Sequence, residues 1–268
     1  MVVLTIQLVS CSNNEQDEIS FNGLQTENIL QKYGEQHNLG LDYIKLDAEK
    51  VSGIYTKSRL DSVFEDLVVF QYGHDNAKGQ LDKASAIKEL AFNGTIPCLD
   101  RTRCDNIDGF TKQANAFALK VLKDCMVNIA NYLDNVHEDE MFDNDNLLAE
   151  LHTIIVNNYI VNVKKCNSDI DANALAQTLG VLYGSIEYWT NSDNVECWAS
   201  INMQSDKIKP SAALYNAKSI TRAQESNKKL SKSEWLQTVA AADAIGALAG
   251  GPAAVACSAG AALYFDVE

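Results

Sequence analysis

Residues 246–265 read GALAGGPAAVACSAGAALYF, a stretch without a charged side chain near the end of a strongly acidic chain. Its length would let a helix cross a bilayer, but alanine and glycine dominate it, and Pro252 follows two glycines near its middle. Because proline cannot continue a helix and glycine readily ends one, this GGP sequence predicts a break. The region therefore predicts two short helices, 235–249 and 253–265, folded back on each other as a hairpin.

Three interpretations of this hairpin stay open: it is buried and completes a helical domain, it inserts into a membrane as a pore-forming or bacteriocin-like element, or it drives self-association. We favour burial, because few large apolar residues gain little from lipid but fit well between helices that offer bulky side chains. Asp243 also favours burial or function over a plain span, since a carboxyl group there needs a partner. Close backbone approach is expected at Gly246, Ala249, Ala256 and Gly260.

Helical periodicity extends upstream of the hairpin. With only three prolines in the chain, apolar residues recur at steps of three and four in most segments. Thr26 and Asp171 are expected to cap helices, and Ser231 with Glu234 forms a capping-box pattern. The polar stretch 190–229 has a poorer pattern, with room for one helix at 211–225. The other predicted helices cover residues 27–50, 59–71, 85–92, 110–135, 147–166 and 172–189.

The fold class expected from these patterns is all-α: a single helical domain with a C-terminal Gly/Ala-rich helical hairpin. The sequence has no repeat at a fixed period and no strong linker. The expected division is a signal segment at 1–10, a polar tether at 11–24, the helical domain at 25–230 and the hairpin at 231–268.

Charge restricts the classes of partner. The chain has 268 residues, 46% of them hydrophobic, and a formal net charge of -14. Its lysines and arginines form no cluster beyond isolated pairs. We therefore expect no nucleic acid and no anionic membrane surface as a partner, because both are bound through clustered basic side chains.

The N-terminus reads MVVLTIQLVSC, an apolar run that ends at Cys11 and is followed by polar residues. It resembles the lipobox of bacterial lipoproteins, which implies that Cys11 becomes the acylated first residue of the mature protein. The chain departs from that pattern in having no lysine or arginine before the apolar run. The alternative is a buried first strand in which Cys11 is an ordinary small apolar residue.

Six further cysteines remain, an even number in a chain expected to be exported. Cys98 and Cys104 lie close together in PCLDRTRC and are the candidates for a local disulfide, whereas Cys125 and Cys257 fall on apolar faces. Spacing alone leaves the pairing open, because it does not fix side-chain geometry. No CxxC or zinc-module spacing occurs, so we expect no metal site.

Two segments, GEQHNLGLDYI from Gly34 to Ile44 and WLQTVAAADAIGALAGGPAAVACSAGAA from Trp235 to Ala262, resemble secreted lipoproteins of the Bacteroidota. The resemblance covers about a sixth of the chain. It implies export and the overall build of the protein, and it implies nothing about an activity. It also implies that Ser62, in Asp61-Ser62-Val63, matches a short O-glycosylation sequon of exported proteins. The residues matched are Gly34, His37, Asn38, Leu41, Asp42 and Tyr43 in the first segment and Trp235, Asp243, Gly246, Ala247 and Gly250 in the second.

Candidate chemistry is sparse. His37 could act as a general base, but we favour a packed core histidine, since no nucleophile stands in a recognised motif beside it. The acidic residues between His137 and His152 fit neither HExxH nor an EF-hand loop and favour a solvated turn. No phosphate-binding or nucleophile-elbow motif occurs, so no catalytic residue and no cofactor are expected.

The leading hypothesis is therefore a lipid-anchored protein of the cell envelope, at the outer membrane or cell surface, with a binding or assembly role. Its partners would be the membrane, through Cys11, and a protein partner or a second copy of the chain, with the ligand unknown. A membrane-active protein that uses the hairpin is the alternative, and an envelope hydrolase that uses His37 or the His137–His152 region is a weaker one.

Overall fold

The computed structural model describes residues 23–51, 56–73, 78, 115–201, 230–248 and 251–264. These residues contain helices and no strand, which confirms the all-α expectation. The elements are α1 (Gly23–Glu49), α2 (Lys57–Tyr72), α5 (Ala116–Leu133), the short 3₁₀ helix η2 (Glu138–Glu140), α6 (Asp145–Val163), α7 (Asp169–Trp189), α8 (Ser192–Ser200), α10 (Lys232–Ala247) and α11 (Gly251–Tyr264).

Side-chain caps fix where most of these helices begin. An oxygen of an asparagine, serine or threonine accepts a hydrogen bond from a backbone N–H of the first turn, which otherwise has no partner. The expected capping box is present, with Ser231 and Glu234 each accepting from the other's backbone N–H. The remaining caps of this kind are Thr56, Asn115, Asn144, Ser168 and Asn191.

Three expectations about helix positions were wrong. α1 begins at Gly23, so Thr26 lies inside the helix rather than before it. Ser168, not Asp171, caps α7, because the Ser168 hydroxyl accepts the Asp171 N–H and places that aspartate in the first turn. α8 occupies part of the stretch expected to be irregular, and its only buried side chains are Val195 and Trp198. The predicted helices at 85–92 and 211–225 lie outside the described residues.

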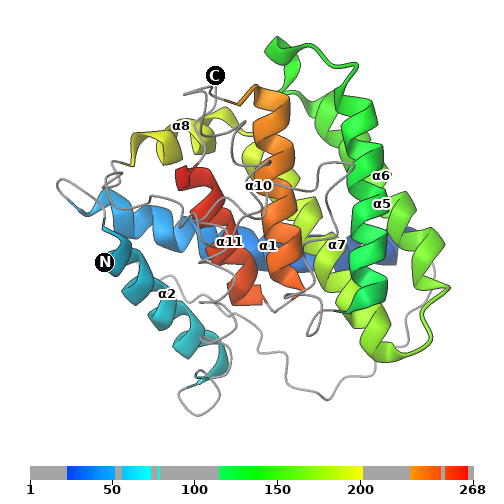
Figure 1. The fold of residues 1–268 in the computed structure, drawn as a ribbon, viewed down its shortest axis with the longest axis horizontal. Coiled ribbons are helices and arrows are strands. Elements are labelled where there is room, and N and C mark those ends of the chain that lie inside the picture. Colours follow the sequence, from blue (N-terminus) through cyan, green and yellow to red (C-terminus); the bar gives the residue numbers. More distant parts are fainter. Residues whose placement is uncertain are drawn as a thin grey trace, which may run out of the picture.

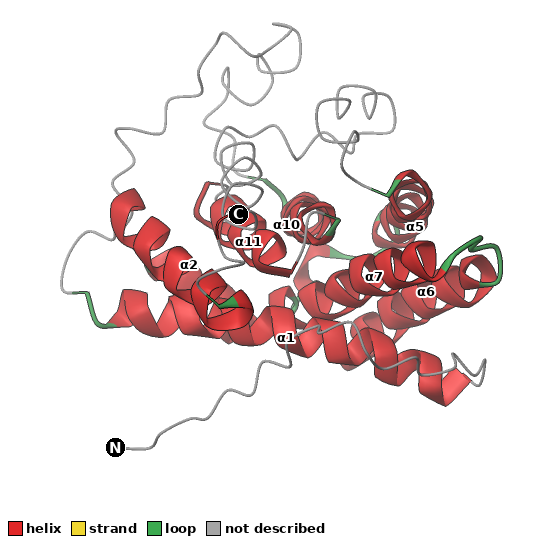
Figure 2. Cartoon of the chain, turned by 90° about the horizontal axis from the view of Figure 1, so that it is seen from below, coloured by secondary structure: helices red, strands yellow, loops and turns green. Residues whose placement is uncertain are grey.

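α7 is the central helix of the domain. It packs against α1 along one side, against α10 on another and against α5 and α6 on a third. Figure 2 shows α1 as a long helix along one side of the molecule, with α5, α10 and α11 toward the opposite side. Every described α-helix contributes buried apolar residues to one large cluster, and Val181, Ala247 and Ala254 form a small second one, so the domain has a single main core.

The C-terminal hairpin is part of that core. α10 and α11 pack on each other, α10 also packs on α7, and α11 on α1. Trp189 of α7 lies at this junction, with its ring edge-to-face with Trp198 and Trp235. Most residues of the charge-free stretch whose burial the structure describes therefore lie in the protein interior, where small side chains let helices pack closely.

Candidate functional site

The site begins at a crossing where α1 and α7 touch through their backbones. A Cβ atom added to Gly184 would lie 2.3 Å from the Gly34 Cα, and one added to Gly34 would lie 2.7 Å from the Gly184 Cα. One turn earlier on α7, a Cβ on Gly180 would lie 2.8 Å from the Leu30 carbonyl oxygen. Only glycine fits at these positions, and the close approach brings the next turn of α1, with His37 and Asn38, against α7.

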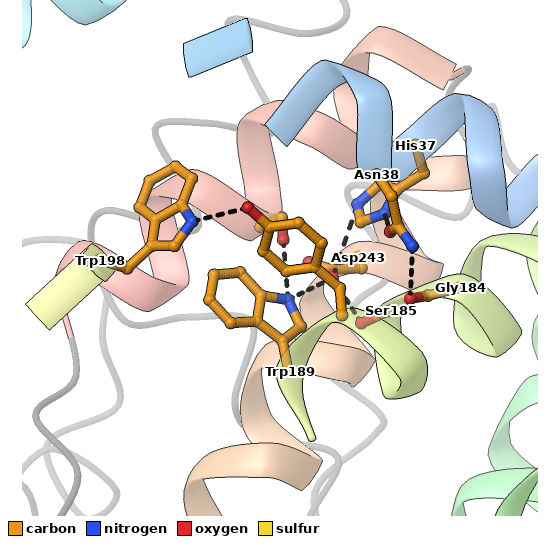
Figure 3. Close-up of polar contacts among 9 residues, drawn as sticks. His37, Asn38, Gly184, Ser185, Trp189, Trp198 and Asp243 are labelled. Carbon is orange, nitrogen blue, oxygen red and sulfur yellow. Dashed lines mark hydrogen bonds and ion pairs between the residues drawn. The ribbon is translucent and has the colours of Figure 1, made fainter. Parts of the chain in front are cut away.

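Asn38 joins α1 to α7 and also orients His37 (Figure 3). Its Nδ2 donates to the Gly184 carbonyl oxygen at 3.0 Å, and its Oδ1 lies 3.0 Å from the His37 Nδ1. Because that amide oxygen can only accept, the hydrogen-bond network assigns the imidazole proton to Nδ1. The His37 Nε2 therefore presents a lone pair to whatever lies on its other side.

Asp243 of α10 lies on that other side, with its side chain fully buried. Its Oδ2 accepts the Ser185 hydroxyl at 2.6 Å and the Trp189 indole N–H at 3.2 Å, and that indole also lies 3.2 Å from the Ser258 Oγ of α11. We call His37, Asn38, Ser185, Trp189, Asp243 and Ser258 the polar node. It links α1, α7, α10 and α11 through side chains in the core.

The contact between His37 and Asp243 is looser than the others. The His37 Nε2 lies 3.5 Å from the Asp243 Oδ2, and neither this nitrogen nor the Asp243 Oδ1 has a hydrogen-bond partner. A lone pair facing a carboxylate in a dry interior would be repulsive. One proton held between the two groups removes that repulsion.

The electrostatics agree with a single shared proton. Burial raises the pKa of Asp243 to about 7, although the hydrogen bonds from Ser185, Ser258 and Trp189 act to lower it. Burial lowers the pKa of His37 to about 4, against the hydrogen bond to Asn38, which raises it. Between these values the pair consists of a neutral carboxylic acid and a neutral imidazole, which is the state that a low-dielectric interior favours.

The node lacks the contact that a hydrolase would need. In a catalytic triad the imidazole contacts the nucleophile and the carboxylate holds the far side of the ring. Here the Ser185 hydroxyl donates to Asp243, and it is the His37 Nε2 that faces Asp243. His37 is 3% exposed and Ser185 is 0% exposed. The arrangement supports the interpretation of His37 as a packed core histidine.

The structure brings together four of the candidate residues from the two sequence segments: Gly34, His37, Asn38 and Asp243. Gly246 is buried one turn after Asp243 on α10. Ser62 is exposed on α2, and its hydroxyl donates to the Ser58 carbonyl oxygen. The candidates Cys11, Cys98, Cys104 and Gly250 lie outside the described residues.

The two other histidines of interest lie in different surroundings. His137 is exposed and precedes η2, whereas His152 of α6 stacks on the Tyr183 ring at 3.5 Å between centroids. Burial lowers the pKa of His152 to about 4. Within the part of the chain that the structure describes, no group of three or more His, Cys, Asp or Glu side chains is placed to hold a metal ion.

Sequence reasoning missed half of the node. Ser185 and Trp189 belong to a helix for which only the apolar stripe was noted, and Ser258 sits among the alanines of the tail. The sequence GVLYG, from Gly180 to Gly184, could have indicated a close helix crossing just before Ser185, because two small residues four apart allow helices to approach closely.

Comparison of the chain with protein-family models, with curated proteins and with solved structures finds no match. The resemblance to secreted lipoproteins therefore stays a proposal.

The shared proton predicts how stability depends on pH. Between about pH 4 and 6.5 the folded pair holds its one proton on Asp243, and the unfolded pair holds one on His37. Because the pair binds one proton in both the folded and the unfolded state, it does not make the unfolding free energy depend on pH in this range. Asp243→Asn removes the folded-state proton and the carboxyl group beside His37, while burial still disfavours protonation of the imidazole in the folded protein. We expect this variant to lose about 3 kcal/mol of unfolding free energy as pH falls from 6.5 to 4.

Urea unfolding of wild type and Asp243→Asn at several pH values measures this difference, and His152 contributes equally to both proteins. The double variant His37→Gln, Asp243→Asn is the control. It has no imidazole at position 37, so unfolding cannot expose one there to protonation. Parallel stability profiles for wild type and Asp243→Asn would show that the pair does not share a proton.

Proposed function

We propose that this protein is a lipid-anchored component of the cell envelope whose helical domain has a binding or assembly role rather than a catalytic one. The observation that carries the proposal is the burial of the C-terminal hairpin. The apolar part of α10, from Val239 to Ala247, is buried throughout, and its one carboxyl group is bonded to α7. The segment best suited to act on a membrane is used as core.

The competing functions have less support. No helix among the described residues combines the length and the hydropathy needed to cross a membrane. Release of the hairpin into lipid would also break the contacts of Asp243 with Ser185 and Trp189 and carry a carboxyl group into hydrocarbon. A hydrolase is also less supported, because His37, Ser185 and Asp243 are buried and the Ser185 hydroxyl bonds the carboxyl group instead of the imidazole.

The anchor in this proposal comes from the sequence. Leu8-Val9-Ser10-Cys11 has the small residue and cysteine of a lipobox, and polar residues follow it as a tether would. A mature lipoprotein carries more than one acyl chain, which makes membrane attachment stable. The net charge of -14 favours partners other than nucleic acid.

Intact-mass spectrometry of the protein isolated from its native envelope tests the anchor. We expect a mature chain that begins at Cys11 and carries the additional mass of acyl groups, because the cysteine of a lipobox is acylated and becomes the first residue of the mature protein. The Cys11→Ala variant is the control and should stay unprocessed and free of lipid. An unprocessed, lipid-free wild type would contradict the proposal.

Dye release from liposomes tests the membrane-active alternative. Release by the wild type, and not by the Gly246→Leu, Gly250→Leu double variant, would favour that alternative over a packed hairpin.

A further inference from the structure

The outer face of α1 carries an apolar stripe. Leu39, Tyr43 and Leu46 are 38%, 39% and 50% exposed, and their spacing of four and three residues places them on one side of the helix. They are three of the seven large apolar side chains that are exposed among the described residues. Figure 2 shows that α1 runs along one side of the molecule. The stripe is therefore a contiguous surface feature on a single helix.

Two of the acidic groups beside the stripe are paired with basic side chains. The Lys45 Nζ lies 3.0 Å from the Asp42 carboxylate and also lies over the Tyr188 ring. Arg59 of α2 holds Asp47 through two hydrogen bonds from its guanidinium group. Glu35 and Glu49 lie one turn before and after the stripe and accept hydrogen bonds from Gln31 and Cys197. The charged groups around the stripe therefore carry no net positive charge, and a zwitterionic lipid surface fits it better than an anionic one.

The position of α1 in the chain points to that partner. Residues 12–22 separate Cys11 from Gly23, where α1 begins. Such a segment reaches at most about 40 Å when extended, and Leu46 lies about 35 Å along the helix from Gly23. A lipid anchor at Cys11 would therefore let α1 lie flat on the bilayer that holds the anchor.

We propose that Leu39, Tyr43 and Leu46 form the face through which the anchored domain rests on a zwitterionic lipid surface. This inference rests on the proposed anchor at Cys11. Two leucines and a tyrosine bind lipid weakly on their own, and the anchor makes the contact effectively intramolecular. Tyrosine suits the interface, because its ring is apolar and its hydroxyl stays in water. A second copy of the chain is the competing occupant.

Site-specific photo-crosslinking tests the proposal. The full chain carries p-benzoylphenylalanine in place of Tyr43 or, as the matched control, in place of Val127. Val127 is 40% exposed on α5, which packs on α6, α7 and α10. Two preparations are compared on phosphatidylcholine vesicles: the protein from its native envelope, and a chain held by an N-terminal hexahistidine tag on nickel-chelating lipid. Mass spectrometry counts the lipid adducts.

We expect about tenfold more lipid adduct from position 43 than from position 127 in both preparations, and a marked loss when Leu39→Gln and Leu46→Gln are added. Equal adducts at the two positions overturn the docking face and leave the anchor intact. If only the tagged chain binds vesicles and labels lipid at position 43, the result contradicts the anchor at Cys11 and supports the docking face. Crosslinks from position 43 to a second chain instead of lipid overturn the proposal in favour of a dimer.

Discussion

The variant Asp243→Ala is expected to unfold with about 3–5 kcal/mol less free energy than the wild type. Its methyl group leaves the Ser185 hydroxyl without its acceptor in the core, and it leaves the Trp189 indole N–H with only the Ser258 Oγ. It also leaves His37 facing a cavity. A buried polar group without a hydrogen-bond partner costs the full free energy of removing it from water. A loss of this size is a large fraction of the stability of an ordinary domain.

Urea or thermal unfolding, followed by circular dichroism at pH 7, measures this loss. Asp243→Asn is the matched variant, since it keeps an acceptor for Ser185 and Trp189 and should lose far less stability. Asp139→Ala, at an exposed position in η2, controls for the loss of a carboxylate alone. Equal stabilities for the alanine and asparagine variants at position 243 would show that the node contributes little to folding.

The variant Gly184→Ala is expected to lose about 3 kcal/mol of unfolding free energy. The added Cβ would lie 2.3 Å from the Gly34 Cα and 2.6 Å from the Gly34 carbonyl carbon. These are backbone atoms, so the clash is relieved only if α1 and α7 move apart, which also strains the hydrogen bond from Asn38 to the Gly184 carbonyl oxygen. The gain in helix propensity from glycine to alanine is only about 1 kcal/mol, so the steric effect wins.

Two other glycines provide graded controls in the same unfolding experiment. At Gly40 the added Cβ would meet only the Val255 side chain, with its Cγ2 at 2.6 Å. Valine can shift, so Gly40→Ala should cost less than Gly184→Ala. Gly73 has φ +73° and open space around it, so Gly73→Ala should cost about 1 kcal/mol through backbone strain alone. A Gly184→Ala variant as stable as the wild type would contradict the close crossing.

The Gly34→Ala, Gly184→Ala double variant separates a shared clash from two independent ones. Both methyl groups require the same separation of α1 and α7. The double variant should therefore lose less unfolding free energy than the two single variants lose together. Together with the Asp243 series, this result would assign the segment from Gly34 to Asn38 to folding. Glycine provides the close approach there, and His37 and Asn38 provide the polar contacts.

Much of the local structure could be predicted from the amino-acid sequence. Helical periodicity places most of the described helices, the Ser231 and Glu234 pattern marks the start of α10, and the GGP sequence marks the break between α10 and α11, with Pro252 in the first turn of α11. These features depend on side chains within a turn or two of each other, so they can be read along the chain. The predicted cap of α7 was wrong, because Ser168 and Asp171 are both good capping residues three positions apart.

The residues that contact Asp243 could not be predicted without the packing of the helices. The sequence indicated that this carboxyl group needs a partner, and Ser185 and Trp189 provide it from 58 and 54 residues away. The approach of α1 to α7 likewise depends on Gly34 and Gly184 facing each other across a helix crossing. Such pairings follow from how helix faces pack into one core, and no local pattern along the chain carries that information.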